Sequence, residues 1–253
     1  MTSATPSLAT RVAIVTGSAR NIGRATALML AREGASIMVH ARQDADGVAE
    51  TRKLLEQAGA PAGTHLADLT TEAGAQSLID ATVARFGRLD ILVNNAAIRR
   101  NQPFTEITLK DWHEVLANSL DCAFLCARSA VPHMRKNKWG RIVNIGGITQ
   151  FKGTPGRAHV AAAKAGMAGL TRVLAAELGP DGITSNMVAP GAIDTVRGGA
   201  AGARPAARSG DGVPLGRDGT PDEIAHIVTM LCRPDGGYTT GQVIQVNGGV
   251  HFS

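Results

Sequence analysis

The sequence contains few aromatic residues and few cysteines. Two Trp, one Tyr and five Phe in 253 residues are too few to form a surface on which bases stack. A nucleic-acid partner is therefore not expected, despite a net charge of +5. Three cysteines without a Cys-x-x-Cys pair indicate neither a disulfide framework nor a zinc site. This cysteine usage fits a reducing, cytoplasmic environment.

Long apolar runs are also absent. No stretch of 18 apolar residues occurs, and the N-terminal segment MTSATPSLATR lacks the apolar centre of a secretion signal, so we expect no membrane association. The small, polar residues 1–10 are expected to form a disordered tail. Residues 11–253, with 44% hydrophobic and 19% charged residues over the whole chain, are expected to fold as one domain.

Short apolar runs alternate with longer amphipathic stretches along the chain. The expected strands lie at 12–15, 37–39, near 65, and at 89–93, 141–145, 183–188 and 243–246. The expected helices lie at 22–33, 45–58, 72–86, 108–134, 157–178 and from 221 onward. This alternation predicts an α/β fold: a doubly wound, Rossmann-like sheet of seven parallel strands covered by helices on both faces.

One long segment has the composition of a loop. Residues 197–212 are rich in Gly, Ala and Arg and cannot form a core. Ligands bind beyond the carboxyl ends of parallel strands, so we expect a mobile lid over about 195–217, although an idle surface loop would have the same composition.

The first expected strand is followed by a glycine-rich turn with the sequence Thr16-Gly-Ser-Ala-Arg-Asn-Ile-Gly-Arg-Ala25. Such a turn opens a helix whose N-terminal amides can bind a pyrophosphate. A tight strand-to-helix turn without a ligand can have the same spacing.

Further residues follow in a familiar order. They are Asp68, the run Asn94-Asn-Ala-Ala97, Asn118, Lys164 and Pro190-Gly191. With the glycine-rich turn, they make residues 10–250 resemble the short-chain dehydrogenase/reductase family, in particular its β-ketoacyl-carrier-protein reductase and gluconate-dehydrogenase-like members. The resemblance implies a Rossmann-like fold, an NAD(P) cofactor and the interconversion of a carbonyl and an alcohol.

The resemblance also implies a set of cofactor-binding residues. They are Gly17, Arg20, Asn21, Ile22, Gly23, Arg42, Asp68, Leu69, Asn94, Ala96, Lys164, Pro190, Gly191, Ile193 and Thr195. Asn21 stands where the family usually has a glycine, and asparagine tolerates the positive φ that such a turn needs. Asp68 and Asn94 can instead act as a helix cap and as a strand-end hydrogen-bonding group.

The end of the second strand bears on the choice of cofactor. NAD-binding proteins place a carboxylate there to bind the adenosine ribose, whereas this sequence has Ala41 followed by Arg42. Arg42 and Arg20 can together hold a 2′-phosphate. We therefore expect NADP(H) in preference to NAD(H), unless both arginines are merely solvated.

The sequence departs from the family at two catalytic positions. Family members use a Ser, a Tyr four residues before a Lys, that Lys and an upstream Asn. Counting back from Lys164 places Val160 at the tyrosine position and Gly147 at the serine position. The only tyrosine, Tyr238, precedes the last strand, and family geometry places it far from the nicotinamide.

Few groups are left to donate a proton. Asn118 and Lys164 remain as catalytic residues. The candidates for the proton donor are Lys164 itself, a water held by both residues, or His159. His159 can also be an ordinary histidine on a helix face. Thr149 can hydrogen-bond a substrate oxygen, but an unactivated hydroxyl is a poor acid.

Three functions remain open. The first is an NADP(H)-binding oxidoreductase with a reduced catalytic set, the second a cofactor-binding subunit without activity that pairs with an active homologue, and the third a lyase or isomerase. Arg99 and Arg100, with Arg197, Arg204 and Arg208 in the expected lid, favour an anionic substrate such as a carboxylate or an acyl thioester.

Two further expectations concern assembly and metals. The helices at 108–134 and 157–178 are expected to pack between subunits of a dimer or tetramer, through the small and apolar residues Ala161, Ala162, Ala168 and Leu170. Cys122 and Cys126 share one helix face, which small buried side chains explain better than a metal site, so we expect no metal.

Overall fold

The structure, a computed structural model, describes residues 7–196, 210 and 212–252. The strands are β1 (Val12–Val15), β2 (Ser36–Ala41), β3 (Ala62–Leu66), β4 (Ile91–Asn94), β5 (Gly140–Ile145), β6 (Ile183–Pro190) and β7 (Val243–Val246). The helices are α1 (Asn21–Arg32), α2 (Ala45–Gln57), α3 (Glu72–Phe86), α4 (Leu109–Leu116), α5 (Cys122–Lys136), α6 (Ala158–Leu178) and α7 (Pro221–Cys232).

The strands form one parallel sheet in the order β3-β2-β1-β4-β5-β6-β7. The predicted doubly wound sheet of seven strands is confirmed. From β1 the chain moves outward to β3 and then returns to β4 on the other side of β1. This change of direction leaves a crevice at the carboxyl ends of β1 and β4, the position where such sheets bind ligands.

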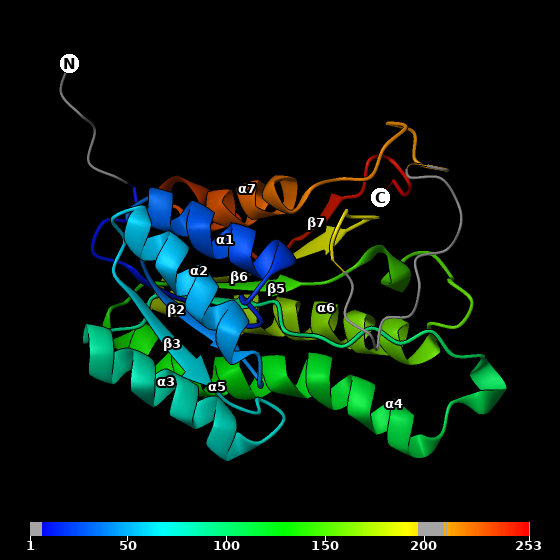
Figure 1. Ribbon diagram of the computed structural model, residues 1–253, viewed down its shortest axis with the longest axis horizontal. Coiled ribbons are helices and arrows are strands. Elements are labelled where there is room, and N and C mark those ends of the chain that lie inside the picture. Colours follow the sequence, from blue (N-terminus) through cyan, green and yellow to red (C-terminus); the bar gives the residue numbers. More distant parts are fainter. Residues whose placement is uncertain (1–6, 197–209, 211, 253) are drawn as a thin grey trace.

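Helices cover both faces of the sheet. Figure 1 shows α1, α2 and α7 on one face and α3, α5 and α6 on the other. Successive side chains of a strand point to opposite faces, and β1 follows this rule: Ala13 and Val15 belong to the core cluster that includes residues of α1 and α7, whereas Ile14 packs with α3 and α5. Burial on both faces explains why β1 is apolar throughout.

The predicted helix at 108–134 contains an irregular turn. The chain passes from α4 into a π-helical turn, Ala117–Asp121, and then into α5. A π-turn inserts an extra residue into the helical ladder, and such turns are frequent at functional sites. Within the described residues, no helix has the length and apolar character needed to cross a membrane.

Two segments, the N-terminal tail and the lid, were expected to lack regular structure, and the structure describes only part of each. Residues 7–10, which we assigned to a disordered tail, instead form a turn in which Leu8 is fully buried and donates its backbone N–H to the Glu33 carbonyl at 2.8 Å. The tail prediction is wrong for these residues because it overlooked this one apolar anchor. Residues 1–6 and most of the expected lid, including Arg197, Arg204 and Arg208, lie outside the described residues.

Candidate functional site

The glycine-rich turn joins β1 to α1 at the crevice. Gly17 has a φ of +63°, and a Cβ on Gly23 would lie 2.4 Å from the Gly17 carbonyl oxygen. Glycine is therefore needed at both positions, at the first for its backbone conformation and at the second for close packing. Asn21 has a φ of +51°, which confirms the positive φ predicted for it.

The N-terminus of α1 is suited to an anion. Arg20 makes no side-chain cap there, and the first turn of α1 contains no acidic residue, whereas Asp44 caps α2 and Thr71 caps α3 through their side chains. Uncapped amides at the positive end of a helix dipole bind phosphate groups. This turn fits the pyrophosphate of a dinucleotide.

The loop after β4 is tied to the glycine-rich turn. The Thr16 hydroxyl accepts hydrogen bonds from the backbone N–H groups of Asn95 and Ala96, both at 2.9 Å. The Asn95 side chain donates to the carbonyls of Thr16 at 2.8 Å and Gly17 at 3.0 Å. Sequence analysis missed this role of Asn95, although the residue stands within the motif that carried the resemblance.

Asn94, one of the expected cofactor-binding residues, is 4% exposed. Its side chain donates to Asn144 Oδ1 at 2.9 Å, and Asn144 in turn donates to the Thr171 hydroxyl at 2.9 Å. This chain of side chains links β4, β5 and α6. The side chains of Ile22 and Leu69 are also buried in the core, so a ligand can reach these two residues only through their backbone atoms.

Two arginines flank the end of β2 at the expected adenosine position. Arg42 Nη2 lies 2.7 Å from Asp68 Oδ2, and Arg20 Nη2 lies 3.7 Å from Asp44 Oδ2. Both arginine side chains are about half exposed, at 53% and 54%. Burial opposes ionisation of Asp68, but hydrogen bonds from Thr70 and the charge of Arg42 hold the pKa of Asp68 below its usual value.

Lys164 lies on α6 at the carboxyl end of β5. Its Nζ donates to the Ile145 carbonyl at 2.7 Å, and the residue is 7% exposed. Burial, followed by repulsion from the Arg99 charge, lowers the pKa of Lys164 to about 8. A lysine with such a pKa can both donate and accept a proton near neutral pH.

The residues around Lys164 offer few acidic groups. Val160, one helical turn earlier on α6, is 6% exposed. Gly147 has an extended backbone (φ 171°), and a Cβ there would meet Thr149 Oγ1 at 3.9 Å and no nearer atom of the described chain. Asn118 lies in the π-turn and donates its side-chain amide to the Glu114 carbonyl at 2.9 Å.

His159 is fully buried, and neither of its ring nitrogens has a hydrogen-bond partner among the described residues. Burial and the charges of Arg100 and Arg157 lower its pKa, while Asp111 opposes this effect. Asp111 belongs to α4, so the ring lies in the charged surroundings between α4 and α6.

Arg100 was expected to favour an anionic substrate. Its guanidinium instead contacts Asp111 and lies 2.6 Å from Glu114 Oε2. Two carboxylates therefore neutralise this arginine, and the expectation that Arg100 provides positive charge to the cleft is wrong. Both acidic residues lie on α4, which the charge pattern of the sequence did not place near Arg100.

Pro190 is the last residue of β6, and the segment that follows it carries Gly191, Ile193 and Thr195 at the carboxyl end of the sheet. The Gly191 N–H donates to the Val246 carbonyl at 3.0 Å, and Asp194 N–H to the Gly219 carbonyl at 2.8 Å. Both ends of the expected lid are thereby held together. The Asn21 side chain exchanges two hydrogen bonds with the backbone of Val196, at 2.8 and 3.0 Å.

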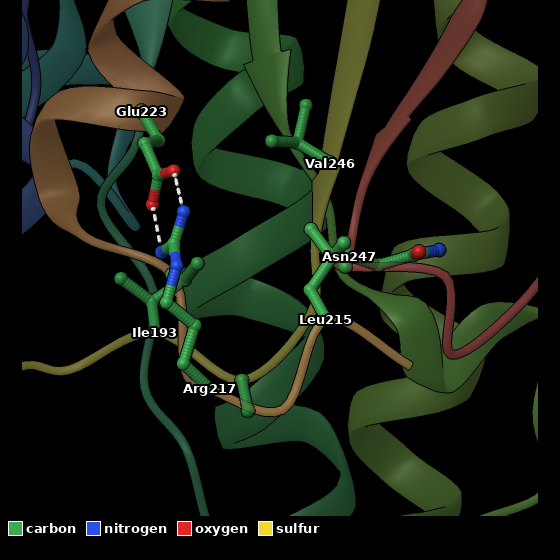
Figure 2. A pocket seen from close by; sticks show the side chains of 9 residues that line it. Ile193, Leu215, Arg217, Glu223, Val246 and Asn247 are labelled. Atoms are coloured by element: carbon green, nitrogen blue, oxygen red, sulfur yellow. Dashed lines mark hydrogen bonds and ion pairs between the residues drawn. The ribbon is translucent and has the colours of Figure 1, made fainter. Parts of the chain in front are cut away.

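A small cavity of about 100 Å³ lies between the two ends of the expected lid and the end of β7 (Figure 2). Its walls include Ile193, Leu215 and Val246. Arg217 and Glu223 also line it and form a bidentate ion pair at 2.6 and 2.9 Å. This volume is that of a few water molecules, so the cavity is too small for a cofactor.

The C-terminal segment reaches the loop that follows Gly147. His251 stacks on Phe151 with ring centroids 5.2 Å apart. Sequence analysis did not single out either residue, because no spacing rule connects positions 100 residues apart.

The structure also bears on two expectations about helix faces. Ala168, expected to contact another subunit, is 5% exposed and packs in the core with Ala123, Met167 and Met187, so that expectation is wrong. Burial raises the pKa of Cys122 to about 12, and no group of three metal-ligating side chains occurs among the described residues.

Three features lie together at the carboxyl end of the sheet: an uncapped helix N-terminus, a glycine-rich turn at the switch point of the sheet and a buried lysine. Together they define a dinucleotide-binding α/β protein.

Comparison with known proteins narrows this class. The family profile described as "Enoyl-(Acyl carrier protein) reductase" matches residues 17–251. The 3-oxoacyl-[acyl-carrier-protein] reductase FabG of Aquifex aeolicus is 36% identical over 240 residues, which cover 95% of this chain and 97% of that protein. The (2S)-[(R)-hydroxy(phenyl)methyl]succinyl-CoA dehydrogenase subunit BbsD of Thauera aromatica is 38% identical, with 94% and 96% coverage.

Solved structures agree. Acetoin dehydrogenase from Enterobacter cloacae is 40% identical, with a TM-score of 0.86 over 95% of each chain. A dehydrogenase/reductase from Sinorhizobium meliloti 1021 is 36% identical, with a TM-score of 0.89 over 98% of each chain. The chain belongs to the short-chain dehydrogenase/reductase family of NAD(P)-dependent oxidoreductases.

Proposed function

We propose that the protein is an NADP(H)-binding oxidoreductase whose catalytic set lacks the family's usual serine and tyrosine, with Gly147 and Val160 in their places. The observation that carries this proposal is Lys164, which is buried at the site with its pKa lowered to about 8. A charged group is costly to bury, and a protein that no longer used the site would have no need to keep it there.

The cofactor, when bound, would supply a hydride to a carbonyl carbon or accept one from the carbon of the corresponding alcohol. The chain's own residues bind the cofactor and orient it. The glycine-rich turn and the N-terminus of α1 hold the pyrophosphate, and Pro190 to Thr195 cover the nicotinamide. Lys164, or a water held by Lys164 and Asn118, provides the proton in place of the missing phenol.

Arg20 and Arg42 support a preference for NADP(H). Each is half exposed beside the end of β2, and each is paired with a single carboxylate, which a 2′-phosphate can replace through charge-assisted hydrogen bonds. NADH offers no group for these bonds.

A fluorescence titration tests this preference. We expect NADPH to bind at least about tenfold more tightly than NADH. Arg42→Ala should weaken NADPH binding and leave NADH binding nearly unchanged. Arg52→Ala is a matched control, because Arg52 is similarly exposed but pairs with Glu56 on the outer surface of α2. Equal affinities of the wild-type protein for both cofactors would contradict the preference.

The substrate is proposed to be a small molecule with an anionic or acyl-thioester group. FabG of Aquifex aeolicus is named for an acyl-carrier-protein substrate and BbsD for a CoA substrate, which supports a thioester. Turnover of NADPH with a panel of ketones and 3-oxoacyl thioesters tests this, and a panel without turnover would contradict an active enzyme of this class.

A second candidate is a cofactor-binding subunit that pairs with an active homologue. Two observations favour it: the aliphatic Val160 beside Lys164, and the description of the Thauera relative as a subunit. In this case the isolated protein should bind NADPH without turnover and should copurify with a homologue that has the tyrosine. A lyase or isomerase activity is not favoured, because such a protein would not need the phosphate-binding turn.

A further inference from the structure

His40 is a buried histidine near the end of β2 with both ring nitrogens engaged. The residue is 2% exposed. Its Nδ1 lies 3.2 Å from the backbone nitrogen of Gly17, and its Nε2 lies 3.0 Å from the carbonyl oxygen of Ala67. Gly17 opens the glycine-rich turn, and Ala67 immediately precedes Asp68.

The chemistry of the two partners fixes the protonation state of the ring. A backbone N–H can only donate, so Nδ1 must carry a lone pair to accept from Gly17. A carbonyl can only accept, so Nε2 must carry the proton and donate to Ala67. The ring is therefore neutral, in the Nε2–H tautomer.

The surroundings favour the neutral ring. Burial lowers the pKa of His40 to about 4, the hydrogen bond to Ala67 opposes this shift, and His65 lowers the pKa further. His65 is the register partner of His40 on β3. A proton on Nδ1 would point at the Gly17 N–H and break that hydrogen bond.

The backbone of His40 strengthens the same connection. Ser18 N–H donates to the His40 carbonyl at 2.9 Å, and His40 N–H donates to the Ser18 hydroxyl at 3.0 Å. Residue 40 thus links the turn after β1, the end of β2 and the loop after β3. These are the segments proposed to bind the pyrophosphate and the adenosine.

We propose that His40 is a positioning residue for the dinucleotide, which holds the pyrophosphate turn and the Asp68 loop at a fixed separation through its two ring nitrogens. The proposal rests on the cofactor binding proposed above. His40 contacts no reacting atom. Its loss would take this partner from the partly buried Gly17 N–H and from the partly buried Ala67 carbonyl, and both segments would lose the contact that fixes their separation.

Three variants of the full-length protein test the role by NADPH titration. His40→Leu retains most of the volume but neither hydrogen bond, and we expect its Kd for NADPH to rise about tenfold or more. His40→Asn can keep an acceptor near the Nδ1 position, so we expect a smaller rise. His65→Leu is the matched control: it removes a neighbouring histidine whose Nε2 lies 3.1 Å from Ser77 Oγ on α3, and its Kd should equal that of the wild-type protein.

The outcomes separate the inference from the proposed function. A wild-type protein that binds neither NADPH nor NADH would overturn the proposed function. A wild-type protein that binds NADPH, together with a folded His40→Leu variant of unchanged Kd, would overturn the role of His40 alone.

A spectroscopic measurement keeps the test decisive if His40→Leu fails to fold. Nitrogen-15 NMR of the wild-type histidine rings should show His40 as the neutral Nε2–H tautomer, and its ring signals should shift when NADPH is added while those of His65 do not. A Nδ1–H tautomer, a charged ring or signals insensitive to NADPH would overturn the inference.

Discussion

A lysine ammonium is costly to bury, and Lys164 is buried with the Ile145 carbonyl as its hydrogen-bond acceptor. In the unfolded chain its pKa is the usual 10.5, whereas in the folded protein burial lowers its pKa to about 8. Below pH 8 the group is charged in both states, and the lowered pKa corresponds to a cost of about 3 kcal/mol in the free energy of unfolding.

This cost has a defined pH dependence. Between pH 8 and 10.5 the unfolded chain binds more protons at Lys164 than the folded protein does, so the free energy of unfolding rises with pH and the cost disappears above 10.5. Lys164→Met should therefore be more stable than the wild-type protein at pH 7 by roughly 1 to 3 kcal/mol. The difference should shrink as the pH rises from 8 to 10.5.

Denaturant unfolding of both proteins at several pH values measures the difference between their free energies of unfolding. Groups that titrate alike in both proteins cancel in this difference. A difference that stays constant from pH 7 to 10.5 would show that the pKa of Lys164 is not lowered.

Restoring the missing acid tests the proposed catalytic set. Gly147→Ser fits without strain, because the backbone is extended and the nearest atom to a new Cβ is 3.9 Å away. Combined with Val160→Tyr, it should raise carbonyl reduction with NADPH by roughly a hundredfold. Lys164 would lower the pKa of the new phenol through its charge.

The matched control is Val160→Phe with Gly147→Ser, which adds the same ring without the hydroxyl. Equal rates for the Tyr and Phe proteins would mean that the wild-type protein uses a different proton donor. In that case Lys164→Ala and His159→Ala, compared on the native substrate, would identify it.

The residues of the site could be predicted where a motif fixed them. Gly17 and Asn21 have the positive φ that the glycine-rich turn needs, because both belong to a short segment whose local structure follows from its sequence. His40, Asn95 and His251 could not be predicted in their roles, since their partners are 23, 79 and 100 residues away in the chain. Arg100 was misjudged for the same reason, because its acidic partners belong to the next helix.

At the scale of elements, the joint between β1 and α1 allows very little space. A Cβ on Gly23 would lie 2.4 Å from the Gly17 carbonyl oxygen and 2.7 Å from the side chain of Asn95. Gly23→Ala should therefore displace the turn and weaken NADPH binding by about a hundredfold or more, and should also lower the melting temperature.

Gly153→Ala is the control for this change, because no described atom lies within 4 Å of its new Cβ. The two variants are compared by NADPH titration and thermal unfolding. A Gly23→Ala protein with wild-type affinity would mean that the turn does not contact the cofactor.

Helices and strands could be predicted from the sequence to within a few residues. The apolar runs and the amphipathic periods are local features of the sequence, and tertiary packing changed the bounds of the elements little. The π-turn that carries Asn118 could not be predicted, because its five residues are too few for a hydrophobic period to be recognised in them. The turn at residues 7–10 was missed because a single buried leucine has no periodicity.

At the scale of the whole molecule, α5 and α6 each leave an apolar side chain exposed to solvent. Val173 is 60% exposed and Phe124 is 45% exposed. Gly169 on α6 is exposed, and no described atom lies within 4 Å of a Cβ built on it. A second helix can approach such a position closely.

We therefore expect a dimer or tetramer in light scattering at micromolar concentration. Gly169→Arg should shift the distribution toward smaller species by placing a charged side chain at the contact. Gly153→Arg, which adds the same charge to an open loop position, should not. A monomeric wild-type protein would contradict this prediction.

The stacking of His251 on Phe151 places the end of the chain beside the loop that carries Gly147. Leu8, in contrast, is hydrogen-bonded to Glu33 after the end of α1. It lies near the amino end of the sheet, where β1 begins. An affinity tag or surface linker attached at the N-terminus would leave the mouth of the site open, whereas the same tag at the C-terminus would crowd it.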